Sequence, residues 1–273
     1  MFLSVCNIQN YSRLSTVTKN AEKDRPISME PFWNMVGQLS FARDVRALVY
    51  ERYGINLNTL ADLHRAKVRC AGIATIDFKN ASNSNWLVVL RDLLPRNVMK
   101  LLMDLRTPIT HYNGQFHWWN MLAPMGNGFT FEIMTVVLLH LARVFDPNAT
   151  VFGDDVMIAQ DVAPQFIKLC EALGWVVNTD KSFITGNFRE SCGAFSEIAS
   201  QRLLHSFDFH EITDEVGICV TANKLRSIAR AGQVSPAMFK LLVASWIEIV
   251  KTLPRVVWRS DQFYERTLTR SLS

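Results

Sequence analysis

The stretch at residues 149–159 reads ATVFGDDVMIA, and the fold is decided there. Two short, partly β-branched apolar runs, Ala149–Phe152 and Val156–Ala159, flank the turn sequence Gly153-Asp154-Asp155. This pattern predicts a β-hairpin that carries two carboxylates at its tip. Gly-Asp-Asp is also an ordinary turn sequence, so the hairpin by itself is weak support for a functional site.

A third acidic position ends another strand-like run. Residues 72–78 read GIATIDF, a short apolar segment that is typical of a buried strand, with Asp77 near its carboxyl end. A carboxylate in such a place needs a partner or a function, because burying an unpaired charge is costly. Asp77 is therefore a candidate site residue, although backbone amides at the strand end could also satisfy it.

Helical and strand-like patterns alternate along the rest of the chain. Glycine or proline stands where helices are expected to end, as at Gly54 and Pro95. Gly126-Asn127-Gly128 precedes the longest apolar helix, whose first turn holds Glu132, where the helix dipole favours an acid. The expected elements are a basic loop or hairpin at 11–30, helices at 31–53, 86–93 (capped by Ser82 or Ser84), 98–105, 129–145 and 164–173, and strands at 175–178 and near Phe183.

This order predicts an α+β fold, a split βαβ antiparallel sheet with helices on one face. Asp77 then lies beside Asp154 and Asp155 at one edge of the sheet. Three adjacent carboxylates repel one another without a cation, and their hard oxygen ligands suit Mg²⁺, for which Mn²⁺ can substitute. Two such ions, about 3.5 to 4 Å apart, support an in-line phosphoryl transfer. The expected reaction class is therefore phosphoryl transfer.

A basic segment precedes Pro26. Lys19, Lys23 and Arg25 lie close together in the chain and would suit a triphosphate, although such segments are more often solvated surface. Trp118-Trp119 is expected in the core or an interface rather than as a platform for stacked bases.

Composition excludes several classes of protein. With 273 residues, 49% of them hydrophobic, the chain is expected to form one compact globular unit, and a net charge of +4 allows a groove for a polyanion. The five cysteines contain no C-x-x-C pair, so neither a disulfide framework nor a zinc site is expected. The apolar run at 133–145 is interrupted by His140 and Arg143 and is too short for a membrane span. No secretory signal is visible at the start.

Several longer blocks occur in a recognisable order, and together they resemble the replicase subunit of single-stranded RNA bacteriophages, the leviviruses. The Met-Gly-Asn-Gly-Phe-Thr-Phe-Glu and Phe-Arg-Glu-Ser-Cys-Gly blocks are far more specific than the Asp-Asp turn, and the resemblance spans roughly residues 15–193. The matching blocks are Thr18–Asn20, Asp24-Arg25, Glu30-Pro31, Trp33–Met35, Thr75–Asp77, Leu102–Arg106, Met125–Glu132, Gly153–Asp155 and Phe188–Gly193.

The resemblance implies an RNA-dependent RNA polymerase with a right-hand architecture. It implies a partial fingers region with the basic motif at residues 1–70, a palm with the catalytic motifs at 71–195, and a thumb or C-terminal helical region at 196–273. Few residues precede the basic motif, so the chain is expected to be a fragment or a shortened reading frame. Such an enzyme adds ribonucleotides from NTPs to an RNA 3′-hydroxyl and releases pyrophosphate.

The resemblance also assigns roles. Asp77 and Asp154 would be metal ligands, with Asp155 beside them, and Lys181 would protonate the departing pyrophosphate. The implied nucleotide-binding residues are Lys19, Lys23, Arg25, Ser82, Asn83, Gly126, Asn127 and Thr130, with Gly128 in the same motif as the last three, and Phe188–Gly193 begins the implied primer grip. Asn83 stands where the family pattern has an aspartate, and its amide can still bond a ribose hydroxyl.

The implied partners are the RNA template, the nascent RNA, NTPs, the host elongation factors Tu and Ts and a ribosomal protein, in the cytoplasm of an infected bacterial cell and without a membrane. Two other functions stay open. One is a non-catalytic RNA-binding remnant of a truncated replicase, and the other is a reverse transcriptase, which shares the palm.

Overall fold

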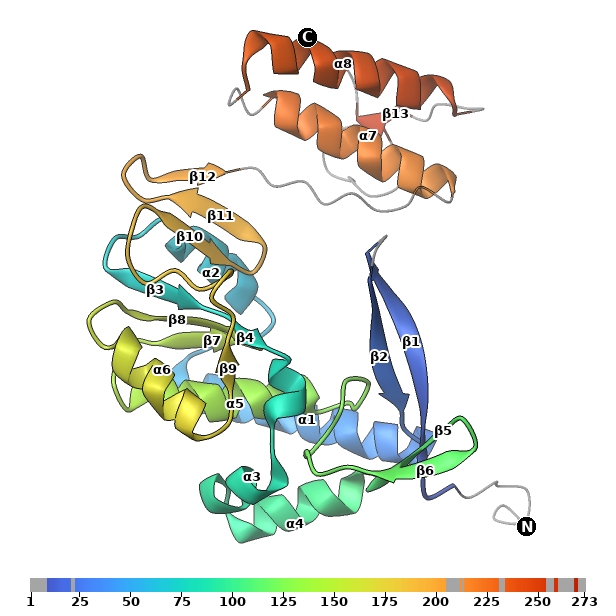
Figure 1. Cartoon of the computed structure of the whole chain (residues 1–273), viewed down its shortest axis with the longest axis vertical. Coiled ribbons are helices and arrows are strands. Elements are labelled where there is room, and N and C mark those ends of the chain that lie inside the picture. The colour runs from blue at the N-terminus through green and yellow to red at the C-terminus, as the bar shows by residue number, and fades with distance from the viewer. Residues whose placement is uncertain are drawn as a thin grey trace. The chain divides into compact units, whose positions relative to one another are not determined.

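The computed structural model describes residues 9–20, 23–204, 212, 214–230 and 234–253, together with two short strands at 258–259 and 268–269. The chain divides into two compact units, not the single unit expected from its composition. They are described separately: residues 1–17 with 25–204, and residues 18–24 with 205–273. Figure 1 labels the elements along the chain. None of the described helices is long and apolar enough to cross a membrane.

The first unit is centred on a three-stranded antiparallel sheet in the order β3-β8-β7. β3 is Ile73–Ile76, and the hairpin predicted around the Asp-Asp turn is formed by β7 (Thr150–Phe152) and β8 (Asp155–Ala159). Ile73 pairs with Ala159 and Ile76 with Val156, so the strand expected at residues 72–78 lies directly beside the hairpin. Two short strands, β4 (Phe78–Lys79) and β9 (Val176–Val177), pair next to this sheet.

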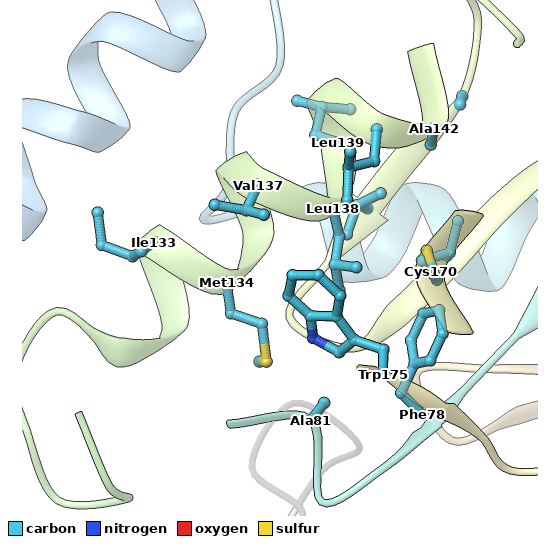
Figure 2. Close-up of a cluster of buried hydrophobic side chains, with 14 of the residues drawn as sticks. Phe78, Ala81, Ile133, Met134, Val137, Leu138, Leu139, Ala142, Cys170 and Trp175 are labelled. Atoms are coloured by element: carbon cyan, nitrogen blue, oxygen red, sulfur yellow. The ribbon is translucent and has the colours of Figure 1, made fainter. Parts of the chain in front are cut away.

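Helix α5 (Thr130–Arg143) provides the core of the unit. It is apolar on most faces because it packs against β7, β8, α6 (Ala163–Ala172) and α1 (Phe32–Tyr53). Figure 2 shows Leu138 and Leu139 of this helix facing a cluster that includes Trp175 and Phe78. The long buried helix predicted at residues 129–145 is thus confirmed.

The other predicted helices are present with shifted ends. α1 ends at Tyr53, and the next residue, Gly54, has a φ of 66°, in the left-handed region that favours glycine. The cap prediction is wrong, because α3 begins after Trp86 without a side-chain cap and Ser84 Oγ donates to the Asn80 carbonyl. The remaining helical elements are α2 (Leu60–Lys67), the 3₁₀ helix η2 (Ala81–Ser84), α3 (Leu87–Leu93) and α4 (Arg96–Leu105).

Two further sheets lie in the first unit, apart from residues 18–24 of the β1–β2 hairpin, which group with the second unit. The basic segment forms the hairpin of β1 (Ser12–Asn20) and β2 (Lys23–Met29), which joins β5 (Ile109–Tyr112) and β6 (Gln115–Trp118) in the order β2-β1-β5-β6. The β5–β6 hairpin was not predicted. The third sheet contains β10 (Phe188–Ser191), β11 (Ala194–Glu197) and β12 (Arg202–Leu204).

The second unit contains two packed helices, α7 (Glu215–Arg230) and α8 (Pro236–Lys251). Ser235 caps α8, because its side chain accepts a hydrogen bond from the Met238 amide. Two short strands, β13 (Trp258–Arg259) and β14 (Leu268–Thr269), pair in parallel.

The α5 core gives a stability prediction. Leu138→Ala should lower the free energy of unfolding by about 2 to 5 kcal/mol, because Leu138 is fully buried and the truncation leaves a cavity. Val88→Ala removes apolar groups from a residue that is 70% exposed. It should change the free energy of unfolding by about 0.5 kcal/mol or less. Urea denaturation of both variants measures the difference. Equal losses would contradict the assignment of α5 to the core.

Candidate active site

The Asp-Asp turn is held against helix α5. Gly153 has a φ of 65°, and a Cβ at this position would lie 2.9 Å from Cε2 of Phe131. Its amide donates to Thr135 Oγ1 at 3.0 Å, which ties the turn to the helix. Glycine is therefore required here by both conformation and space.

The sheet register brings the three predicted carboxylates together. Ile76 pairs with Val156 in an antiparallel ladder, so Asp77, one residue later, comes opposite Asp155. Burial raises the pKa of Asp155, and the neighbouring carboxylates of Asp77 and Glu190 raise it further. Burial also raises the pKa of Asp154, with Asp155 as the next cause. The three acids thus form one cluster in which each added charge is unfavourable.

Asp77 is hydrogen-bonded to the segment that follows β9. Its carboxylate accepts a 2.6 Å hydrogen bond from Asn178 Nδ2. Its backbone amide donates to Ser182 Oγ, and its carbonyl accepts from the Asn178 amide and from Ser182 Oγ. Sequence reasoning missed Asn178 and Ser182, because nothing in their local pattern distinguishes them from ordinary loop residues.

Asp155 contacts the hairpin of β10 and β11. Its Oδ1 accepts from the Cys192 amide at 3.2 Å and from Ser191 Oγ at 3.4 Å. Ser191 Oγ also lies 2.9 Å from Nδ1 of the buried His64 on α2. Cys192 and Gly193 both have positive φ, as a type I′ hairpin turn requires. The Phe188–Gly193 segment, predicted to begin the primer grip, is therefore hydrogen-bonded to the Asp-Asp turn.

Two cations lie near the carboxylates. Arg25 on β2 and Lys181 lower the pKa of Asp154, although burial and Asp155 outweigh them. Lys181 Nζ is also 3.7 Å from Glu190 Oε1. The structure thus brings Arg25 and Lys181 near the carboxylates, and their roles in triphosphate binding and proton transfer stay predictions. The side chains of Lys19 and Lys23 lie outside the described residues.

The carboxylates suit a divalent cation by their chemistry. Buried, mutually repelling carboxylates with hard oxygen donors are the ligands that Mg²⁺ takes. In the part of the chain that the structure describes, no three His, Cys, Asp or Glu side chains already stand in a metal-holding arrangement. Asp77 Oδ2 and Asp155 Oδ1 instead bond Asn178 and Cys192.

The loop before α5 is fixed by the β2–α1 region. The Ser28 amide donates to the Met125 carbonyl at 2.7 Å, and the Gly128 amide donates to Gln38 Oε1 at 2.9 Å. Asn127 Nδ2 donates to Glu30 Oε1, and Asn127 Oδ1 accepts from the Phe129 amide. Glu30 was named from sequence only within a matching block and without a role, and Gln38 was not named, because their partners lie about 70 to 100 residues away in the chain.

The remaining predicted nucleotide-binding residues lie in two places. Thr130 Oγ1 donates to the Pro124 carbonyl, so it holds the loop. Ser82 and Asn83 are half-buried in η2, which follows β4 and is separate in sequence from the carboxylate turn. Their roles in nucleotide binding stay predictions.

The loop gives a prediction about Gly126. This residue has a φ of 98°, and a Cβ would lie 2.6 Å from the Ser28 carbonyl oxygen. Gly126→Ala should therefore lower the free energy of unfolding by about 1 to 3 kcal/mol more than Gly114→Ala, which has a φ of 79° but no atom within 4 Å of the added Cβ. Thermal denaturation of the two variants makes the comparison. If the two variants lose equal free energy of unfolding, the positive φ alone accounts for the cost at Gly126, and the contact with Ser28 adds nothing.

Buried His64 gives a prediction about pH. Burial lowers its pKa to about 4, with Lys67 as the lesser cause, whereas an unfolded histidine titrates near 6.5. Between these values the unfolded chain binds more protons, so the His64 contribution to stability is lost as the pH falls. The free energy of unfolding should therefore fall by about 1 to 3 kcal/mol less between pH 7 and pH 4.5 in His64→Asn than in the unmodified chain. Urea denaturation of both proteins at the two pH values tests this. Parallel pH profiles would show that another group is responsible.

Most of this chain is similar in sequence to known proteins. A family model described as RNA replicase, beta-chain, matches residues 2–199. The chain is 30% identical over 253 residues to the RNA-directed RNA polymerase beta chain of Enterobacteria phage GA, covering 88% of this chain and 46% of that protein. It is 34% identical over 203 residues to the RNA-directed RNA polymerase subunit beta of Escherichia virus Qbeta, covering 70% of this chain and 34% of that protein. The chain thus spans less than half the length of these two relatives.

A solved structure supports the fold. The BmCPV RNA-dependent RNA polymerase at elongation state aligns with a TM-score of 0.53 at 8% identity, over 88% of this chain and 26% of that one. The shared feature is an α+β polymerase fold. With the family model covering the sheet, the Asp-Asp turn and the β10–β11 hairpin, the chain belongs to the RNA replicase beta-chain family.

Proposed function

We propose that this chain is the catalytic part of an RNA-directed RNA polymerase that copies a viral RNA genome. The observation that carries the proposal is the cluster of Asp77, Asp154 and Asp155 at the end of the β3–β8 pair, with Arg25 and Lys181 beside it. Membership in the replicase family supports the same reaction.

The carboxylates would hold the divalent ions. Asp77, Asp154 and Asp155 are the proposed ligands of two Mg²⁺, and Asp155 also keeps the β10–β11 turn in place through the Cys192 amide. When bound, these ions neutralise phosphate charge and activate the attacking 3′-hydroxyl. Asn178 would have to release Oδ2 of Asp77 for this role.

The protein side chains would position the nucleotide. Arg25, with Lys19 and Lys23 of the same hairpin, would bind the triphosphate, and Lys181 would give a proton to the departing pyrophosphate. Ser82 and Asn83 would contact the sugar, and the loop of Gly126, Asn127 and Thr130 would support the template and the nucleotide. Positioning and charge neutralisation account for most of the rate in this chemistry.

The larger organisation is proposed from the family. Residues 1–70 would be partial fingers, 71–195 the palm and 196–273 the thumb. The names of the relatives, beta chain and subunit beta, support a complex of several proteins. Elongation factors Tu and Ts and a ribosomal protein are the proposed host partners, in the cytoplasm of an infected bacterium.

Removing a carboxylate tests the proposal. Asp77→Asn and Asp154→Asn should each lower the incorporation of labelled ribonucleotides on an RNA template by about a hundredfold or more, because several kcal/mol of charge stabilisation is lost. Asp161→Asn, an exposed acid in the turn after β8, is the control and should keep the activity. Full activity in both site variants would exclude the metal assignment.

A non-catalytic RNA-binding remnant is the second candidate. Hydrogen bonds from Asn178 and Cys192 occupy one carboxylate oxygen each of Asp77 and Asp155, and a lone pair used in this way is not available to a metal ion. This favours the second candidate. Salt-dependent RNA binding without synthesis, even when the remaining part of a relative's beta chain is supplied in trans, would favour this candidate. Comparing ribonucleotide with deoxynucleotide incorporation in the same assay separates an RNA polymerase from a reverse transcriptase.

A further inference from the structure

The four-stranded sheet β2-β1-β5-β6 has two different faces. On the inner face, Ser12 and Thr110 are buried and form hydrogen bonds with Ser28 on β2. Ser28 also holds Met125 in the loop before α5. The inner face thus supports the proposed template-binding loop, and Figure 1 shows β5 and β6 beside the β1–β2 hairpin.

The outer face is aromatic. Arg13 pairs with His111, and His111 pairs with Phe116, so the three side chains form a row across β1, β5 and β6. Tyr11 lies on the same face, two residues before Arg13. Its ring centroid is 5.2 Å from that of Phe116 and 5.9 Å from that of His111. The rings therefore form one contiguous cluster.

Trp118 extends this row along β6. It lies two residues after Phe116, which places it on the same face about 7 Å further along the strand. Phe116 is 56% exposed and Trp118 is 73% exposed. Trp118 was expected in the core or an interface, and the core assignment is wrong. Most of its ring is therefore open to solvent in this unit.

The charges around the face are compatible with a polyanion. Arg13 is exposed beside the rings, and His111 lies within the row. The two sequence segments that supply the face, residues 9–21 and 105–131, contain no aspartate or glutamate. The strands β1, β5 and β6 therefore offer only cationic and neutral side chains to a phosphate backbone on this face.

We propose that Tyr11, His111, Phe116 and Trp118, with Arg13, form a binding surface for single-stranded RNA outside the carboxylate site. Exposed aromatic rings on a sheet stack with unpaired bases, as in domains whose four-stranded sheet stacks two or three bases, and an arginine beside them binds the phosphates. The inference deepens the proposed function, because it gives the template a place on the face opposite the one that holds the Met125–Gly128 loop.

Single-stranded RNA fits this face better than a protein partner does. A protein interface of useful size needs a broad apolar centre, whereas this face has one row of rings flanked by Arg13 and by the polar Asn113-Gly114 turn. A protein contact is therefore the alternative that the experiment must exclude.

Ring replacements on the full chain test the inference. Fluorescence anisotropy with a labelled single-stranded oligouridylate should show affinity lowered about tenfold in Trp118→Ala and in Phe116→Leu, because each loses one stacked base. Phe116→Tyr keeps a ring and should retain the affinity. Arg13→Ala should lower the slope of log affinity against log salt by about one, and Trp118→Ala should leave that slope unchanged.

Trp33→Ala is the matched control. Trp33 is 64% exposed on α1 and contacts another exposed ring, Phe32, at 5.2 Å between centroids. It should bind the oligonucleotide like the unmodified chain. The inference is overturned if the chain does not bind the oligonucleotide, if Trp118→Ala and Phe116→Leu bind normally, or if Trp33→Ala loses as much affinity. It is also overturned if the Trp118 and Phe116 variants keep RNA affinity but abolish self-association in sedimentation.

Failure of this inference and failure of the proposed function are distinguishable. The anisotropy experiment measures RNA binding without synthesis. A chain that incorporates no nucleotide can therefore still show a lower RNA affinity in Trp118→Ala. Conversely, active chains whose affinity is unchanged by these replacements would keep the polymerase assignment and exclude only this surface.

Discussion

The antiparallel pairing of β3 with β8 is the constraint on which the site depends. It sets Ile76 against Val156 and thereby brings Asp77 to Asp155, which are 78 residues apart in the chain (155 − 77). Slipping the register by one residue would reverse the side chains between the two faces and separate the carboxylates. Helix α5 stabilises this register, because its apolar residues cover β7 and β8 and its Thr135 holds the Gly153 amide.

The surroundings of the cluster hold it in place through backbone contacts. Arg189 is almost fully buried on β10, and its guanidinium donates to the carbonyls of Ile73, Ile184, Thr185, Gly186 and Phe188. This side chain joins β10 to β3, while Ser191 and Cys192 join the β10–β11 turn to Asp155. The hairpin and the carboxylates therefore form one connected structure, so a change in either is expected to affect the other.

Local patterns predicted much of the fold. The β7–β8 hairpin, α1 and the buried α5 were found because apolar periodicity and turn residues act over short distances. The β5–β6 hairpin was missed although the sequence carries its signal, since Asn113-Gly114 is a hairpin turn pair and polar and apolar residues alternate in Gln115–Trp118. Every residue of β6 is exposed, so no buried face marks the strand. The cap at Ser82 or Ser84 failed because Ser84 bonds the preceding turn at Asn80 instead.

The sequence by itself determined the candidate carboxylates and cations, since the resemblance of the motif blocks identified Asp77, Asp154, Arg25 and Lys181. Only the tertiary structure decided what these residues contact. Asn178 bonds Asp77, the β10–β11 turn bonds Asp155, and the outer face of β5 and β6 exposes its rings. The physical reason is that such contacts join residues far apart in the chain, and short-range propensity and periodicity carry no information about which distant partners meet.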